Sequence, residues 1–342
     1  MMNSPAEIGR KVARRATLVL LLTAVTLPCG GQPISKICGL NFSPYGPGED
    51  PNAGAVVSRA QIHHRLAIVA PYTTWIRTFG STNGVEHAAE IAHGMKLKTA
   101  VGAWIGRDRN ANAREIANVR AMITAGNVDL AIIGSETLLR RDASAADIVR
   151  YLNEVRRAHP AVVLGYADIY QQLLANPSVV QASDVVLANI YPYWEGVPVS
   201  NAVGMVADRY TRLAAAFPRK TIVISETGWP SRGEAVGQAI PSPENQEFYL
   251  RSFAAWASAN NVPYFFFEAF DEAWKQRKEG LRGGAWGIWD EQAHLKANLE
   301  SALVQSKDSS LQFCRPAAAP GHVGHCLIAS SRRLKATTQL HQ

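Results

Sequence analysis

The chain has 342 residues, of which 47% are hydrophobic and 18% charged, enough for one large buried core such as an α/β barrel of about 250 residues. Its formal net charge is +7, but residues 1–36 and residues 305–342 each carry a net +4, which leaves −1 for the 268 residues between them. The body of the chain therefore offers no phosphate-binding footprint, and composition argues against a nucleic-acid partner.

The N-terminus has the pattern of an export signal. A basic stretch (residues 10–15) precedes an apolar run (residues 16–27) that ends at Pro28 and a pair of glycines. So short an apolar run suits the central region of a signal peptide better than a membrane span of about 20 residues. We interpret residues 1–31 as a signal peptide or, alternatively, as an N-terminal anchor that tethers the protein to a membrane. We therefore expect an exported protein, periplasmic or extracellular.

Eight short and almost continuously apolar runs follow, as expected for parallel strands covered on both faces. They are Ile37–Tyr45, Thr74–Phe79, Lys98–Trp104, Val128–Glu136, Ala161–Tyr170, Asp184–Tyr193, Thr221–Thr227 and Tyr264–Phe270. Their alternation with amphipathic stretches predicts an α/β fold, a closed (β/α)8 TIM barrel that forms a single domain over residues 37–304. The alternative, an open doubly wound sheet, is weakened because no glycine-rich dinucleotide motif follows the first run.

The segments between these runs carry helix boundary signals. Three begin with a capping serine and its partner or with a serine followed by proline: Ser58 with Gln61, Ser144 with Asp147, and Ser242 with Pro243. Gly94 and Pro160 stand where helices should end. After about residue 305 the composition shifts to small and basic residues, which predicts a poorly ordered tail over residues 305–342.

The cysteines give weaker information. Cys38 lies in the first apolar run, where we interpret it as a buried small hydrophobic residue. Cys314 and Cys326 could pair in the tail of an exported protein. No regular zinc-ligand spacing is present, so we expect no metal.

Acidic residues stand at the ends of three of the apolar runs. The fourth run ends in Glu136, the seventh in Glu226, and the eighth carries Glu268 and is followed by Asp271 and Glu272. In a (β/α)8 barrel the active site lies at these carboxyl ends. Carboxylates there cost desolvation energy, so a functional role is easier to explain than a structural one.

Aromatic residues gather at the same end of the predicted barrel. They are Tyr45, Trp104, Tyr191, Tyr193, Trp194 and Trp229. Each alone is as well explained by core packing, but together they favour a cleft for pyranose rings. Two glutamates facing each other across such a cleft are what a retaining glycosidase needs, one as nucleophile and one as acid/base, about 5–5.5 Å apart.

The residues around Glu226 carry a specific resemblance. The segment IVISETGWPS (residues 222–231) resembles the nucleophile motif of family 17 glycoside hydrolases, the β-1,3-glucanase family. Further matches follow in barrel order: GLNFSPY at the first strand, RTFGS at the second, NIYPYWEG at the sixth, FEAFDEAWK at the eighth, then GGAWGIWD. The chain looks most like bacterial members associated with β-1,3/β-1,6-glucan synthesis.

The resemblance implies roles for individual residues. Glu226 would be the nucleophile and Glu136 the general acid/base, while Arg77 would keep Glu226 charged. Glu272 and Lys275 would bind sugar hydroxyls or tune Glu136, although a solvated ion pair is the simpler alternative. The residues expected to line glucose subsites are Tyr191, Tyr193, Trp194 and Trp229. The expected partner is a β-glucan, cleaved at β-1,3 bonds with possible transfer to position 6, and no cofactor is needed because the carboxyl pair performs the whole reaction.

One position departs from the family. Where the family has Gly-Asn-Glu, this chain has Gly134, Ser135 and Glu136. The family asparagine contacts the 2-hydroxyl of the sugar being cleaved, and Ser135 is shorter. The departure favours a transferring role over efficient hydrolysis. It also motivates the alternative of a non-catalytic glucan-binding or scaffold barrel in an envelope polysaccharide system, against which the intact glutamate pair speaks.

Overall fold

The computed structural model describes residues 33–34 and 36–304. The expected signal peptide or anchor, the expected tail, and the suggested Cys314–Cys326 pair lie outside these residues and stay predictions. No helix within the described part of the chain has the length and apolar character to cross a bilayer.

Eight parallel strands close into a barrel, each paired with the next, and β1 pairs with β8 through Leu40 and Phe266. The strands are β1 (Ile37–Asn41), β2 (Thr73–Arg77), β3 (Lys98–Ala103), β4 (Leu130–Ser135), β5 (Val163–Ile169), β6 (Val185–Asn189), β7 (Thr221–Thr227) and β8 (Tyr264–Phe266). The predicted (β/α)8 barrel is therefore confirmed.

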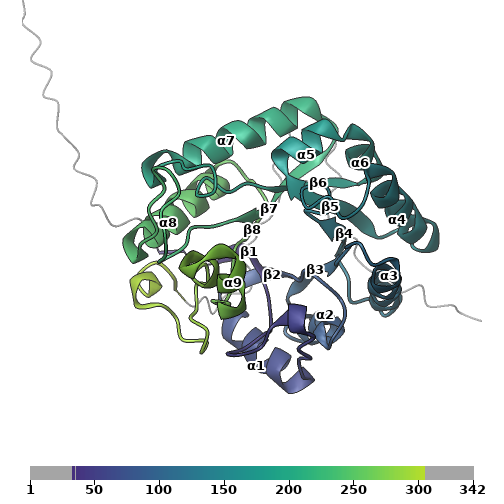
Figure 1. Cartoon of the computed structure of the whole chain (residues 1–342), viewed down its shortest axis with the longest axis horizontal. Helices are drawn as coiled ribbons and strands as arrows, with labels where there is room; N and C mark the ends of the chain where they lie inside the picture. The colour runs from purple at the N-terminus through teal and green to yellow at the C-terminus, as the bar shows by residue number, and fades with distance from the viewer. Residues whose placement is uncertain (1–32, 35, 305–342) are drawn as a thin grey trace, which may run out of the picture. The chain divides into compact units, whose positions relative to one another are not determined.

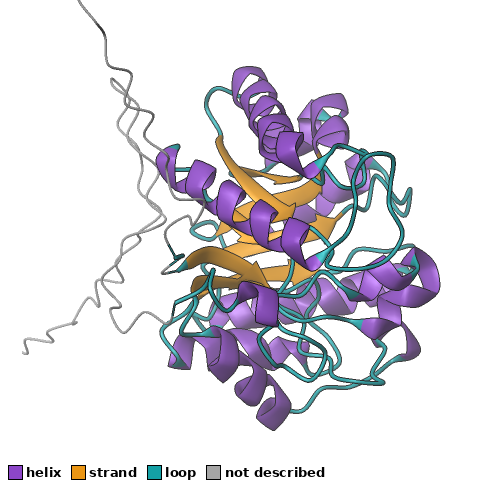
Figure 2. Ribbon diagram, turned by 90° about the vertical axis from the view of Figure 1, so that its left-hand side faces the viewer, coloured by secondary structure: helices purple, strands orange, loops and turns teal. Residues whose placement is uncertain are grey.

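Helices surround the barrel, as Figure 1 shows with the labels β1 to β8 inside a ring of helices, and Figure 2 shows the orange strands enclosed between purple helices. They are α1 (Arg59–Val69), α2 (Ala88–Gly94), α3 (Arg109–Thr124), α4 (Ala145–Ala158), α5 (Tyr170–Ala175), α6 (Pro177–Ala182), α7 (Val199–Ala216), α8 (Pro243–Ala259) and α9 (Gln276–Glu279). Over the described range, only short helical segments such as α9 follow β8, so the eighth repeat is reduced.

The predicted helix starts are present as hydrogen bonds. Ser58 accepts from the backbone N–H of Gln61, and Ser242 accepts from that of Asn245. Ser144 and Asp147 form a reciprocal capping box at the start of α4. Such side chains satisfy backbone donors that the first helical turn leaves free, so the local sequence fixes where these helices begin.

The barrel interior is filled by small and branched side chains. This inner cluster consists of Ala100, Leu130, Ile132, Ala167, Val185, Leu187, Val223 and Phe265. A larger cluster packs the outer faces of the strands against the helices. The barrel interior below the mouth is therefore filled by apolar side chains, and a polar cleft can form at the carboxyl ends of the strands.

Cys38 departs from the expectation of a plain buried hydrophobic residue. It is almost fully buried on β1, as expected, but it is disulfide-bonded.

Candidate active site

A cleft of about 880 Å³ opens at the carboxyl ends of the strands, within the range usual for ligand sites. Glu136 and Glu226 both line it. Of the other residues predicted to contact sugar, those on its walls are Tyr45, Trp104, Ser135, Tyr191, Trp194, Glu272 and Lys275.

An irregular end of β4 positions Glu136. The pairing of β4 with β5 shifts register between Ile132 and Ser135, and Gly134 and Glu136 both have positive φ, 91° and 52°. A register shift breaks the alternation of side chains and re-aims those that follow. The Glu136 N–H donates to the Ala167 carbonyl at 2.8 Å, which holds the turn against β5.

The chain just beyond Glu136 is fixed by β5. The backbone N–H of Leu138 donates to the Tyr166 hydroxyl at 2.8 Å, and that hydroxyl in turn donates to Asp168. Asp168 is fully buried, and it also accepts from the N–H of Ile169 at 2.8 Å. The turn that presents Glu136 is therefore held by polar groups that belong to a different strand.

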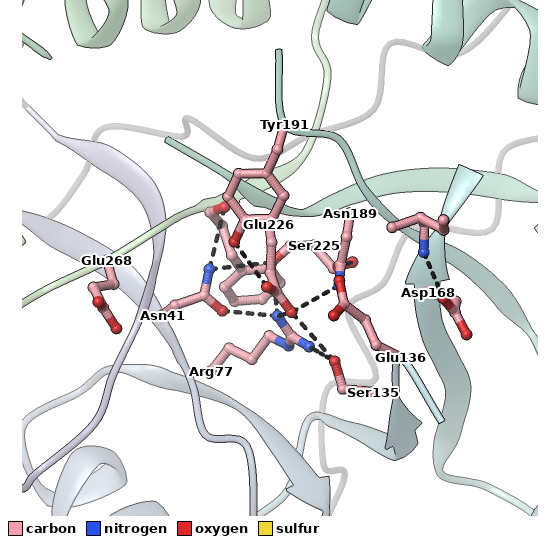
Figure 3. Close-up of polar contacts among 12 residues, drawn as sticks. Asn41, Arg77, Ser135, Glu136, Asp168, Asn189, Tyr191, Ser225, Glu226 and Glu268 are labelled. Carbon is pink, nitrogen blue, oxygen red and sulfur yellow. Dashed lines mark hydrogen bonds and ion pairs between the residues drawn. The ribbon is translucent and has the colours of Figure 1, made fainter. Parts of the chain in front are cut away.

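The Glu226 carboxylate accepts hydrogen bonds from several surrounding side chains (Figure 3). Its Oε1 accepts from Arg77 Nη1 at 2.7 Å and from Ser135 Oγ at 3.2 Å, while Oε2 accepts from the Tyr191 hydroxyl at 2.8 Å. Arg77 is buried, as is the Glu226 side chain. The guanidinium therefore supplies a positive charge against Glu226, in the place where the resemblance puts it.

Asn189 at the end of β6 forms hydrogen bonds with both glutamates. Its Nδ2 donates to Oε1 of Glu136 and to Oε1 of Glu226, each at 2.9 Å. Because both oxygens are this close to one nitrogen, they lie at most about 5.8 Å apart. Figure 3 shows the asparagine between the two carboxyl groups.

The environments of the two glutamates differ. Burial, followed by the nearby charge of Glu226, raises the pKa of Glu136 to about 7, against the lowering effect of the hydrogen bond from Asn189. Burial, followed by the charges of Glu226 and Glu136, raises the pKa of Tyr191 well above its ordinary value. Tyr191 therefore remains a proton donor toward Glu226, and Glu136 can hold a proton near neutral pH.

A second charged cluster lies beside the cleft, and it is not solvated. Lys275 Nζ contacts Glu268 Oε2 at 2.6 Å and Glu272 Oε2 at 2.5 Å, and all three residues are buried. Glu272 also accepts a hydrogen bond from the Ser43 hydroxyl on the β1 side. Burial raises the pKa of Glu268 well above its ordinary value, against the attraction of Lys275. The alternative of a solvated Glu272–Lys275 pair is therefore wrong.

Two of the predicted subsite aromatics do not line the cleft. Tyr193 and Trp229 have no exposed surface. The Tyr193 hydroxyl donates to the Glu234 carbonyl, and Trp229 Nε1 donates to the Ile240 carbonyl at 3.0 Å. Their rings pack behind the cleft wall, where Tyr193 contacts Trp194 edge-on at 5.1 Å between ring centroids. Tyr193 and Trp229 therefore support the cleft wall from behind, because their polar groups form hydrogen bonds inside the fold and do not face the cleft.

Trp104 and Trp194 are exposed aromatic residues on the cleft wall, 43% and 38% accessible. A guanidinium packs on each ring: Arg140 lies 4.1 Å from Trp104, and Arg282 lies 5.0 Å from Trp194. The cation and ring attract each other, which holds each indole in place on the wall of the cleft. Both are suited to stack on a sugar.

Sequence reasoning missed several polar residues of the site. Asn189 and Ser225 are among them, and so is Asn41, which accepts from Arg77 Nη1 at 2.9 Å. All three are short polar side chains that interrupt an apolar strand close to its carboxyl end. That interruption is the same signal that pointed to Glu136 and Glu226, and it could have found them. Among the described residues no set of three His, Cys, Asp or Glu side chains forms a possible metal site.

Comparison with known proteins gives a family match. The sequence model of the BtgE/BtgC glycoside hydrolase domain matches residues 39–287. The "Glucan 1,3-beta-glucosidase" of Saccharomyces cerevisiae is 25% identical over 291 residues, 78% of this chain and 93% of that protein. The "Probable glucan endo-1,3-beta-glucosidase btgC" of Aspergillus fumigatus is 27% identical over 297 residues, and the chain spans only 43% of its length.

A solved structure is similar over the same range. The family 17 β-1,3-glucanosyltransferase of Rhizomucor miehei is 26% identical, with a TM-score of 0.69 over 78% of this chain and 97% of that chain. An active-site mutant of the Rhizomucor enzyme, similar to this chain at 25% identity and a TM-score of 0.68, is in complex with laminaritriose.

Proposed function

The chain belongs to the BtgE/BtgC glycoside hydrolase family, within family 17, and on that premise we propose that it cleaves β-1,3-glucosidic bonds with retention of configuration. Glu226 is the nucleophile and Glu136 the general acid/base. The observation that carries the proposal is the pair of carboxyl oxygens held by one Asn189 nitrogen. Their separation, at most about 5.8 Å, suits direct attack by one carboxylate, whereas inverting enzymes need about 6.5–9.5 Å for a water.

The donors around Glu226 support its role and suggest which oxygen reacts. Oε1 accepts from Arg77, Asn189 and Ser135, whereas Oε2 accepts only from Tyr191 within the described part of the chain. The lone pairs of Oε1 are therefore committed, and Oε2 forms the bond to carbon one of the sugar. The proton moves from Glu136 to the leaving oxygen as that bond forms and the glycosidic bond breaks.

The second half of the reaction decides between hydrolysis and transfer. Glu136, now charged, removes a proton from water or from a sugar hydroxyl, which attacks carbon one and releases Glu226. The relatives support both outcomes, since their names include glucosidases and a glucanosyltransferase. We propose that this chain also transfers, with position 6 as a possible acceptor, and that Trp194 helps to hold that acceptor.

The biological setting is a proposal of its own. We propose that the protein belongs to a bacterial branch associated with β-1,3/β-1,6-glucan synthesis, and that it is exported and either tethered through its N-terminal apolar segment or released. The disulfide at Cys38 supports an oxidising compartment. Fusing residues 1–36 to a periplasmic reporter, and locating both the fusion and the full chain by fractionation, tests this; cytoplasmic retention would contradict it.

Incubation of the purified protein with laminari-oligosaccharides of defined length tests the catalytic proposal. We expect shorter products together with longer or branched ones, and retention of the β-anomer in the first products by NMR. Unchanged oligosaccharides that nevertheless bind would favour the scaffold alternative.

A further inference from the structure

We propose that Asn189 is the positioning residue that holds the catalytic proton on one oxygen of Glu136 and that supports whichever glutamate is charged during the cycle. This inference rests on the proposed function, because it assigns a task within that reaction. It goes beyond the pair of glutamates, since Asn189 need not touch the sugar.

The orientation of the Asn189 amide is fixed by its neighbours. Ser225 Oγ donates to Asn189 Oδ1 at 2.7 Å, and both residues are buried. The Ser225 hydroxyl can donate or accept and so fits either orientation of the amide, but a flipped amide would turn Oδ1 toward Oε1 of Glu226, which as the nucleophile carries no hydrogen. The structure therefore leaves Nδ2 facing the glutamates, and its two hydrogens match its two acceptors.

This orientation places the acid proton. Oε1 of Glu136 accepts from Asn189 Nδ2 at 2.9 Å and so acts as the carbonyl oxygen of the neutral acid. The proton then sits on Oε2, the oxygen left for a leaving group. An acid whose proton is confined to one oxygen is ready for transfer without a rotation of the carboxyl group.

The same amide serves both halves of the reaction. At the start Glu226 is charged and Glu136 neutral, so the stronger of the two hydrogen bonds goes to Glu226. Once Glu226 has bonded to the sugar and Glu136 has given its proton to the leaving oxygen, the negative charge lies on Glu136. The bond from Asn189 to Glu136 then strengthens, which stabilises the intermediate state without any movement of the asparagine.

The pH profile distinguishes this task from a structural one. The bond from Asn189 acts to lower the pKa of Glu136, although burial and the charge of Glu226 outweigh it. In Asn189→Leu, whose side chain is similar in size and has no donor, we expect kcat/KM for laminari-oligosaccharides to fall about 10- to 100-fold. We also expect the alkaline limb of kcat/KM to move to higher pH.

Two further variants complete the experiment. Asn118→Leu removes an asparagine donor on α3 whose Nδ2 donates, among the described residues, to the Ser81 carbonyl alone, so its alkaline limb should stay at the wild-type pH. Ser225→Ala keeps the Asn189 amide but removes the hydroxyl that anchors its Oδ1, so we expect a smaller loss of kcat/KM and a limb shifted in the same direction. If Asn189→Leu does not fold, Ser225→Ala decides the question.

The outcomes separate the two proposals. Wild-type protein that leaves every laminari-oligosaccharide unchanged overturns the proposed function, and this inference with it. Active wild-type protein whose Asn189→Leu and Ser225→Ala variants lose activity, but keep the wild-type alkaline limb, overturns the role of Asn189 alone.

Discussion

At the scale of single residues, the site assigns different tasks to two chemically identical side chains. Glu226 is surrounded by donors, with Arg77 at 2.7 Å, whereas Glu136 receives one amide hydrogen bond from Asn189. Desolvation therefore raises the pKa of Glu136, and the single hydrogen bond from Asn189 offsets little of that rise. The environment, not the residue type, suits Glu226 to the proposed role of nucleophile and Glu136 to that of acid.

Substitution of each glutamate tests these tasks. Glu226→Gln should abolish turnover of every donor, because nothing replaces the nucleophile. Glu136→Ala should keep a trace of activity on activated aryl glucosides, since a good leaving group needs little proton donation, and azide should raise that trace and yield a β-glucosyl azide. Product analysis by NMR is the measurement; azide rescue of Glu226→Ala to a β product would reverse the two roles.

The raised pKa of Glu136 predicts the pH dependence. Because its pKa is about 7, the carboxylic acid needed for the first step persists at lower pH and is lost as the pH rises through this value. For laminari-oligosaccharides we expect kcat/KM to fall on the alkaline side of about 7. For an aryl glucoside with a good leaving group the fall should be shallower. Identical alkaline limbs for both substrates would show that the limb does not report Glu136.

At the scale of elements, the sequence predicted all eight strands but placed several of their ends too late. The first run was expected to reach Tyr45 and the sixth Tyr193, whereas β1 ends at Asn41 and β6 at Asn189. The residues in between are apolar or aromatic because they form the cleft wall, so hydrophobicity alone cannot separate strand from site. The ends of β4 and β7 are also irregular, and such register shifts leave no periodic signal.

The burial of individual side chains was harder to predict than the positions of the strands. Tyr193 and Trp194 are neighbours, yet only Trp194 faces the cleft, because the Tyr193 hydroxyl finds the Glu234 carbonyl inside the fold. That partner is 41 residues further along the chain. Contacts of this kind depend on the tertiary arrangement, which the motif around Tyr193 does not encode locally.

The capping box of α4 gives a prediction at this scale. Ser144→Ala removes the acceptor for the Asp147 N–H and should lower the free energy of unfolding by about 0.5–2 kcal/mol. The change is measured by urea denaturation. Ser200→Ala is the matched control, because this exposed serine of α7 caps no helix and, within the part of the chain that the structure describes, donates only to the neighbouring Asn201 side chain at 3.4 Å. Equal losses in both variants would show that the cap contributes nothing specific.

At the scale of the whole molecule, the candidate active site and the disulfide of Cys38 lie at opposite ends of the barrel. Cys38 is the second residue of β1, near the amino ends of the strands, whereas Glu136 and Glu226 lie at the carboxyl ends. Cys38 is disulfide-bonded. A bond so placed can stabilise the fold without touching the cleft.

Removal of this disulfide should therefore separate stability from activity. Cys38→Ser should lower the free energy of unfolding by about 2–4 kcal/mol, because the crosslink restricts the unfolded chain. Its kcat/KM at 25 °C should stay close to that of wild type, and reductant should lower the Tm of wild type more than that of Cys38→Ser. Thermal unfolding with and without dithiothreitol measures this, alongside thiol counting in denaturant. A Cys38 that reacts with a thiol reagent in the unfolded, unreduced protein would show that the bond does not form.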